Sequence, residues 1–200
     1  PFPGRPRNLD DLINLIGPAI TLALDCRPDR LIVGFSSEFL PNGYEIAAQL
    51  RNYVEDTGKR PTTMASDAVP EALRVLGSKR IGIVTPYPPE TNENVSSYFR
   101  KLGFDVINIT GIARTASGRI DTGQIREAEI REAVAEVDGA DIDTLAQVGT
   151  AMLCSGFSAD LEEKHGKPVV TVNAATYWLA LRQHGFSDTL EDHGILLKDY

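Results

Sequence analysis

Short apolar runs alternate with longer amphipathic segments along most of this 200-residue chain. The run at 31–33 consists of branched aliphatic residues and ends at Gly34, which is followed closely by Ser36 and Ser37. Such a run is typical of a strand that is covered on both faces, and a glycine at its end lets the backbone approach a ligand closely. We therefore predict a buried strand that delivers a polar loop.

The remaining segments predict an alternation of strands and helices. Helices are expected where apolar residues recur at helical spacing, and strands where branched residues cluster. The predicted helices cover 8–24, 43–56, 66–77, 90–102, 124–137, 160–165 and 174–184. The predicted strands cover 31–33, 62–64, 80–85, 104–109, 144–148 and 169–172, with a short edge strand at 195–197 and a polar loop at 111–122. This alternation is typical of α/β folds with mostly parallel sheets.

The two halves of the chain share one plan. The strand before Gly34 is matched by the strand before Gly149, and Gly-Lys-Arg-Pro at 58–61 is matched by Gly-Lys-Pro at 166–168. A strand and a helix follow in both cases. Weak internal symmetry of this kind predicts two similar α/β units that face each other, with the two glycines lining the space between them.

The composition mainly excludes classes of protein and kinds of binding site. A formal net charge of −8 argues against binding of nucleic acid, and no run approaches the roughly 20 apolar residues that span a bilayer. The two cysteines, Cys26 and Cys154, have neither metal-ligand spacing nor a matching set of histidines, so no metal site is predicted. The usual nucleotide-binding glycine motifs are absent. No leader segment is recognised, so we expect a cytoplasmic protein and leave homo-oligomerisation open.

Four separated motifs carry a resemblance to a known family. They are Val33-Gly34-Phe35-Ser36, Val84-Thr85-Pro86-Tyr87, Gln147-Val148-Gly149-Thr150, and Gly166-Lys167-Pro168-Val169-Val170 with Asn173-Ala174-Ala175-Thr176-Tyr177-Trp178. Together they resemble the arylmalonate decarboxylase and maleate cis-trans isomerase family of the aspartate/glutamate racemase superfamily. The resemblance covers nearly the whole chain, and it implies chemistry that uses no metal or organic cofactor.

The resemblance also implies a domain organisation. We expect two pseudo-symmetric Rossmann-like lobes with mostly parallel four-stranded sheets and an active-site cleft between them. Residues 1–77 and 186–200 are assigned to the first lobe and 78–185 to the second, with a crossing of 166–185 back to the first lobe as an alternative. Family members begin with a further strand and ligand loop that we do not find here, so the first lobe is expected to lack its N-terminal strand.

By motif position, the resemblance implies a site that holds a small carboxylate and stabilises an enolate-like intermediate. The implied substrate-binding residues are Gly34, Phe35, Ser36, Ser37, Tyr87, Gly149, Thr150 and Ala151. Tyr87 is also expected to take part in the reaction, because its proline-rich loop limits where the phenol can point. Racemases of this superfamily place one cysteine on each lobe, and this chain has glycine at both places. Proton transfer by a thiol at either standard position is therefore not available.

Two other groups are candidates for the missing acid or base. Glu38 lies two residues after Ser36, so both side chains point the same way if the segment is extended, and apolar neighbours would raise the pKa of the carboxyl. The alternative is a solvated glutamate or a helix cap. Cys154 lies five residues beyond Gly149 and would reach the cleft only through a shifted loop, the alternative being a structural thiol.

These observations predict a cofactor-independent enzyme that acts on a small mono- or dicarboxylate, with decarboxylation of an arylmalonate-like substrate favoured. Decarboxylation requires mainly a desolvated carboxylate and donors for the developing negative charge. The alternative is a maleate cis-trans isomerase or an aspartate, glutamate or hydantoin racemase-like enzyme in which Glu38 or Cys154 moves the proton. A non-catalytic carboxylate-binding protein is kept as a further alternative.

Overall fold

The computed structural model describes residue 6 and residues 8–112 and 119–200 of the chain. The helices are α1 (Leu9–Leu24), α2 (Gly43–Gly58), α3 (Ala65–Val75), α4 (Pro89–Lys101), α5 (Arg119–Gly123), α6 (Glu127–Val137), α7 (Ser158–His165), α8 (Val172–Gln183) and α9 (Ile195–Asp199), with a 3₁₀ turn, η1, at Ser155–Phe157. The strands are β1 (Leu31–Val33), β2 (Thr62–Met64), β3 (Arg80–Thr85), β4 (Asp105–Gly111), β5 (Thr144–Gln147) and β6 (Val169–Thr171). The main strands and helices predicted from the sequence are thus confirmed in position. The expectation that the strand at 31–33 is covered on both faces is wrong, because Ile32 of β1 is 51% exposed.

Two local predictions need correction or qualification. The edge strand predicted at 195–197 is wrong, because this segment is the first turn of α9 and buries Leu196 and Leu197 together. A short apolar run does not by itself separate a strand from a buried helical turn. Of the loop predicted at 111–122, residues 113–118 lie outside the described residues, and the end of that range belongs to α5.

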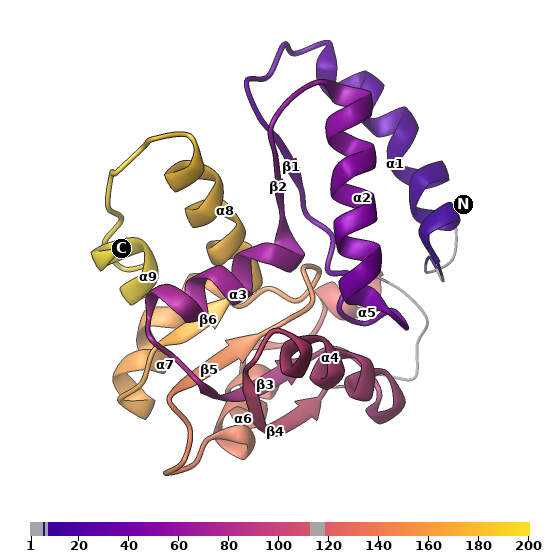
Figure 1. The fold of residues 1–200 in the computed structure, drawn as a ribbon. Coiled ribbons are helices and arrows are strands. Elements are labelled where there is room, and N and C mark those ends of the chain that lie inside the picture. Colours follow the sequence, from indigo (N-terminus) through magenta and orange to yellow (C-terminus); the bar gives the residue numbers. More distant parts are fainter. Residues whose placement is uncertain (1–5, 7, 113–118) are drawn as a thin grey trace.

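All described strand pairs are parallel, and they form two sheets (Figure 1). The larger sheet has the order β4-β3-β5-β6, and the smaller one pairs β1 with β2. The α/β class with parallel sheets is therefore confirmed. The described residues give the second lobe its four strands, whereas they give the first lobe only two.

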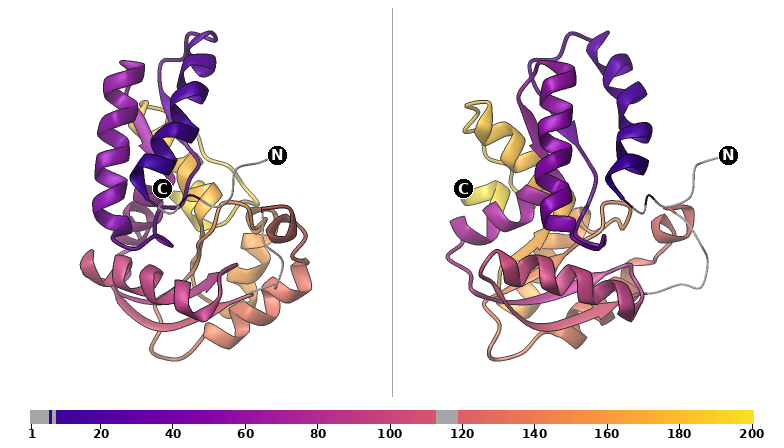
Figure 2. Two further views of the ribbon diagram at one scale, coloured as in Figure 1. Left: turned by 90° about the vertical axis from the view of Figure 1, so that its right-hand side faces the viewer. Right: turned by 45° about the vertical axis from the view of Figure 1, so that its right-hand side comes forward.

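Helices α3 and α8 lie where the two sheets meet. Each follows the last strand of its own sheet directly, α3 after β2 and α8 after β6, and the two helices pack against each other. Figures 1 and 2 show α1 and α2 beside the small sheet, while α4 and α6 accompany the large one. The β2-α3 and β6-α8 units are the structural counterparts of the repeat seen in the sequence.

The domain boundaries stay a prediction. Trp178 on α8 donates from Nε1 to the Tyr200 carbonyl (3.1 Å), and the Ile195 amide donates to Oε2 of Glu162 on α7 (2.8 Å). The C-terminal segment assigned to the first lobe therefore makes these contacts with α7 and α8. No helix in the described ranges is long and apolar enough to cross a bilayer.

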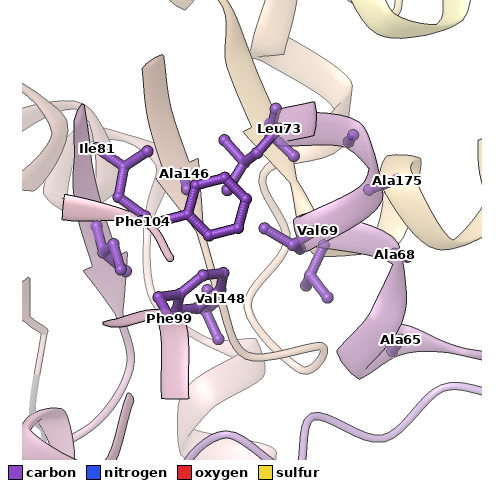
Figure 3. Packing of buried hydrophobic residues seen from close by; sticks show 14 of the residues in the cluster. Ala65, Ala68, Val69, Leu73, Ile81, Phe99, Phe104, Ala146, Val148 and Ala175 are labelled. Carbon is purple, nitrogen blue, oxygen red and sulfur yellow. The ribbon is translucent and has the colours of Figure 1, made fainter. Parts of the chain in front are cut away.

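The largest apolar core lies between α3 and the large sheet. Phe99 and Phe104 approach the helix from the side of α4 and β4, and Val69 and Leu73 of α3 point toward them (Figure 3). The side chain of Phe99 has no exposed surface. Because this core includes residues of both lobes, it sets the position of the loops that leave β1, β3 and β5.

Asp143 ties the start of β3 to the segment before β5. Its carboxylate accepts hydrogen bonds from the backbone amides of Lys79 (3.1 Å) and Arg80 (2.8 Å) and from Nη2 of Arg80 (2.8 Å). The Arg80 guanidinium, helped by these amides, lowers the pKa of Asp143 to about 2. The carboxylate therefore stabilises the folded chain most when it is ionised.

We expect Asp143→Asn to lower the free energy of unfolding at pH 7 by about 1 kcal/mol, a value reduced for the solvent screening of a partly exposed pair. Because the folded pKa lies below the unfolded one, this contribution is present above the unfolded pKa and is lost as the pH falls through the folded pKa. Urea denaturation of both proteins from pH 7 down to about pH 3 measures it. A stability difference that stays constant over this range would contradict the prediction.

Candidate active site

Loops from the carboxyl ends of three parallel strands meet at one small cavity. The loop after β1 comes from the first lobe, and the loops after β3 and β5 come from the second. The cavity has a volume of about 60 Å³ and is lined by Pro6, Phe35, Ser36, Phe39, Pro86, Tyr87, Thr122, Gly149, Thr150 and Ala151. The carboxyl ends of strands are the usual place for ligands in open α/β sheets.

Six of the predicted binding residues surround this cavity, and two do not. The six are Phe35, Ser36, Tyr87, Gly149, Thr150 and Ala151. Ser37 is fully buried outside the lining and donates its hydroxyl to the Gly43 carbonyl (3.2 Å), so it stabilises the turn before α2. Gly34 is exposed and also lies outside the lining. The binding roles themselves stay predictions.

The Tyr87 loop is held by a buried polar contact. The Thr85 hydroxyl donates to Oδ1 of Asn92 (2.6 Å) and accepts from the Tyr87 amide (3.0 Å). On the other side, a Cβ at Gly111 would lie 1.8 Å from the Tyr87 carbonyl oxygen, so only glycine permits this close approach. The Phe39 and Tyr87 rings lie 5.4 Å apart. These contacts fix the backbone from which the phenol projects.

Thr85→Val is expected to lower the free energy of unfolding by about 1–3 kcal/mol, because the Tyr87 amide and the Asn92 side chain then lose a buried partner. Thr85→Ser keeps the hydroxyl and serves as the control, with a smaller loss. Chemical denaturation of the three proteins measures the effect. Equal stabilities of the valine and serine variants would show that the hydroxyl does not hold the loop.

Gly149 begins the turn after β5 and has a left-handed backbone, with φ +106°. A Cβ here would lie 2.6 and 2.7 Å from two ring carbons of Pro86. The Gln147 side chain donates to the Gly149 carbonyl (2.9 Å), and Asn173 donates to the Thr150 carbonyl (3.1 Å). The turn is thus fixed from two sides and pressed against the Tyr87 loop.

Glu38 lies behind the cavity wall and not in it. Its side chain is fully buried, and it is absent from the cavity lining. The expected rise in pKa is confirmed: burial raises the pKa of Glu38 to about 7, and the negative charge of Asp67 adds to this, while the Glu38 backbone and the Ser36 hydroxyl oppose it. Because Ser36 lines the cavity, it stands between the carboxyl and any ligand there.

Cys154 is part of an apolar cluster outside the cavity. It is 1% exposed and packs in the core with Ile130, Met152 and Leu161. Burial raises the pKa of its thiol to about 12, partly offset by Arg131. A thiol with such a pKa is not ionised at neutral pH, and the thiolate is the reactive form. This placement agrees with the structural thiol and does not support a catalytic one.

The cavity also includes residues that the sequence did not suggest. Phe39 and Pro86 adjoin predicted site residues and could have been included through their motifs. Pro6 and Thr122 come from segments far away in sequence, and no local pattern marks them. In the described ranges no group of three or more histidine, cysteine or acidic side chains could hold a metal ion.

A larger cavity of about 430 Å³ lies elsewhere, between α2, α3, α4 and α8. Its charged residues already pair with one another: Arg51 with Asp67 (2.6 Å) and Arg74 with Glu71 (2.5 Å). None of the predicted site residues lines it. We therefore take the smaller cavity, where loops from both lobes converge, as the candidate active site.

Comparison with known proteins finds relatives of two kinds, arylmalonate decarboxylase and maleate isomerase. A sequence profile of the arylmalonate decarboxylase family matches residues 20–197. Maleate isomerase of Pseudomonas putida is 29% identical over 137 residues, which are 68% of this chain and 54% of that protein. Arylmalonate decarboxylase of Bordetella bronchiseptica is 32% identical over 136 residues, or 66% and 54% of the two chains. The matched part is thus about half the length of these relatives.

Solved structures show the same fold. A liganded arylmalonate decarboxylase with a glycine-to-cysteine and a cysteine-to-serine substitution superposes with a TM-score of 0.87 at 19% identity, covering 96% of this chain and 82% of that one. A cysteine-to-serine mutant of Nocardia farcinica maleate cis-trans isomerase, with a covalently bound succinylcysteine intermediate, gives a TM-score of 0.83 at 18% identity and covers 96% and 80%. With the profile match over most of its length, this chain belongs to the arylmalonate decarboxylase family.

Proposed function

We propose that this chain forms the catalytic body of a cofactor-independent enzyme that removes CO2 from a small malonate-type dicarboxylate. The observation that supports this most is the composition of the cavity. Neutral donors, namely Ser36, Tyr87 and Thr150, lie beside the aromatic rings of Phe35 and Phe39. An apolar wall disfavours a bound carboxylate, while the donors stabilise the negative charge that develops as CO2 leaves.

The bond changes follow from this arrangement. The bond between the α-carbon and one carboxylate breaks, CO2 leaves, and the electron pair spreads over the remaining carboxylate as an enolate. Hydrogen bonds from the hydroxyl groups of Ser36, Tyr87 and Thr150, with the backbone amides of the Gly149 turn, hold this charge. A proton is then added to the α-carbon.

The cavity also limits the substrate. At about 60 Å³ it is smaller than the roughly 300–1,000 Å³ of typical ligand pockets. A malonate with a small substituent fits this space best, and an aryl group requires displacement of the Phe35 or Phe39 ring.

Thiol-dependent isomerisation is the second candidate, because one of the matched relatives is a maleate isomerase. A related isomerase carries a covalent succinylcysteine intermediate. In this chain glycine occupies positions 34 and 149, and Cys154 is buried outside the cavity. The positions of these residues favour decarboxylation over the thiol route.

A substrate screen in deuterated water with a metal chelator tests the proposal. The substrates are malonate, methylmalonate, phenylmalonate and maleate. We expect CO2 release from at least one malonate, with one deuterium added at the α-carbon of its product, and no fumarate from maleate. Fumarate formation would support the isomerase instead, and saturable binding without any conversion would support a carboxylate-binding protein.

A further inference from the structure

Glu38 is a buried carboxyl group to which the steps above assign no role. Its side chain has no exposed surface, and neither of its carboxyl oxygens completes a hydrogen bond with a described residue. The hydroxyl of Ser36 is also buried and completes none. Buried polar groups are nearly always hydrogen-bonded, because losing water without a new partner costs free energy. Two such adjacent groups therefore require an explanation.

The groups around Glu38 do not neutralise a carboxylate. Asp67 on α3 adds a negative charge, and the Arg51 guanidinium on α2 is already paired with that aspartate (2.7 Å). Tyr98 on α4 donates its hydroxyl proton to the Ser66 carbonyl (2.9 Å) and not to the Glu38 carboxyl. With no cation of its own among the described residues, the Glu38 carboxyl is held in its neutral, proton-bearing form over a wider pH range than a solvated glutamate.

Ser36 connects this proton to the cavity. It lies two residues before Glu38, both side chains are buried, and Ser36 lines the cavity from the side of the first lobe. A small rotation of the Ser36 hydroxyl would make it a donor to a ligand and an acceptor from Glu38 at once. Positions 34 and 149 are glycines, so no thiol at either position can supply the proton instead.

We propose that Glu38 is the proton reservoir of the cleft and delivers its proton to the substrate through the hydroxyl of Ser36. This inference rests on the proposed decarboxylase function. After CO2 leaves, the Ser36 O–H proton forms the new C–H bond, and Ser36 takes the Glu38 proton in its place. Glu38 is left as a carboxylate and regains one proton from solvent before the next turnover. That proton is the one consumed when a dicarboxylate becomes a monocarboxylate and CO2.

The proposal fixes the direction of the pH dependence. Only the protonated carboxyl can supply the proton, so turnover is constant at low pH and falls as the pH rises through the pKa of Glu38, about 7. Asp67→Asn removes a negative charge that raises this pKa and also frees the nearby Arg51. Both changes favour the carboxylate, so the decline in turnover should move to lower pH.

The test combines turnover of methylmalonate and phenylmalonate with an infrared titration of the carboxyl groups. In the wild type we expect one protonated carboxyl that titrates near neutrality and that is missing in Glu38→Gln, a variant of matched shape. Turnover should fall by about 100-fold or more in Glu38→Gln and in Ser36→Ala. Ser36→Ala should retain the infrared titration, and Glu132→Gln, an exposed change on α6, should resemble the wild type.

The outcomes separate the two proposals. If the wild type converts substrate and Glu38→Gln keeps its rate and its pH profile, the proton-reservoir role is wrong while the decarboxylase function stands. If the near-neutral titration is absent, or persists in Glu38→Gln, the role is also wrong. If the titration is present but no malonate is converted, the proposed function fails and the role fails with it.

Discussion

Gly149→Cys is expected to destabilise the protein strongly, by about 2–6 kcal/mol in the free energy of unfolding. The estimate adds about 1–3 kcal/mol for a left-handed backbone that side chains avoid and about 1–3 kcal/mol for overpacking against a rigid ring. The new Cβ would lie 2.6 Å from a ring carbon of Pro86. Thermal unfolding measures the effect, which corresponds to a lowering of Tm by about 2–4 °C per kcal/mol in a chain of this size.

Gly34→Cys is the matched control for this prediction. Apart from its chain neighbours, no atom of the described residues lies within 4 Å of the place that a Cβ at Gly34 would take, and this glycine does not have positive φ. We expect its stability to remain within about 0.5 kcal/mol of the wild type, as for other unconstrained surface changes. Equal losses at both positions would contradict the geometry. The two glycines are thus equivalent in the repeat but different in what they tolerate.

Tyr87→Phe is expected to reduce kcat by about 100-fold to 1,000-fold, the usual effect of removing one donor to a developing negative charge. The phenol lies beside Gly149, where a Cβ would be 3.4 Å from its oxygen, and the residue lines the cavity. The loss should appear mainly in kcat, because the donor is needed most after CO2 has left. Turnover of the malonate that the wild type converts fastest gives this value.

Tyr177→Phe is the control for the phenol. Its side chain is 52% exposed on α8, and it does not line the cavity. Its turnover should equal that of the wild type. If Tyr87→Phe also retained full activity, the phenol would not be one of the donors, and the site would depend on Ser36, Thr150 and the backbone amides alone.

The fold was predictable from the sequence because its signals are local. The run at 169–171 is a fully buried strand, the run at 31–33 is a strand that buries Leu31 and Val33, and glycines after the helices, such as Gly103, mark where they end. The repeat predicted that the loops after β1 and β5 meet, and residues of both loops line the same cavity. Burial of a segment from both sides leaves a hydrophobic pattern that can be read without knowing its neighbours.

The exact positions within the site were less predictable. Ser36 and Glu38 were expected to point the same way on an extended segment, but the chain turns here, and the Leu40 amide donates to the Ser37 carbonyl (2.9 Å). The turn ends the two-residue alternation and places Glu38 behind Ser36. Cys154 packs in the core against residues of α6 and α7. No pattern in the sequence around Cys154 indicates these contacts.

A crystal structure of this protein with malonate bound tests the central claim most directly. We predict one carboxylate within about 2.7–3.2 Å of Ser36 Oγ and Tyr87 Oη, the range of ordinary hydrogen bonds, with the second carboxylate against Phe35 and Phe39. Malonate bound instead beside Arg51 and Arg74 in the larger cavity, with the space between Ser36 and Tyr87 closed, would contradict it.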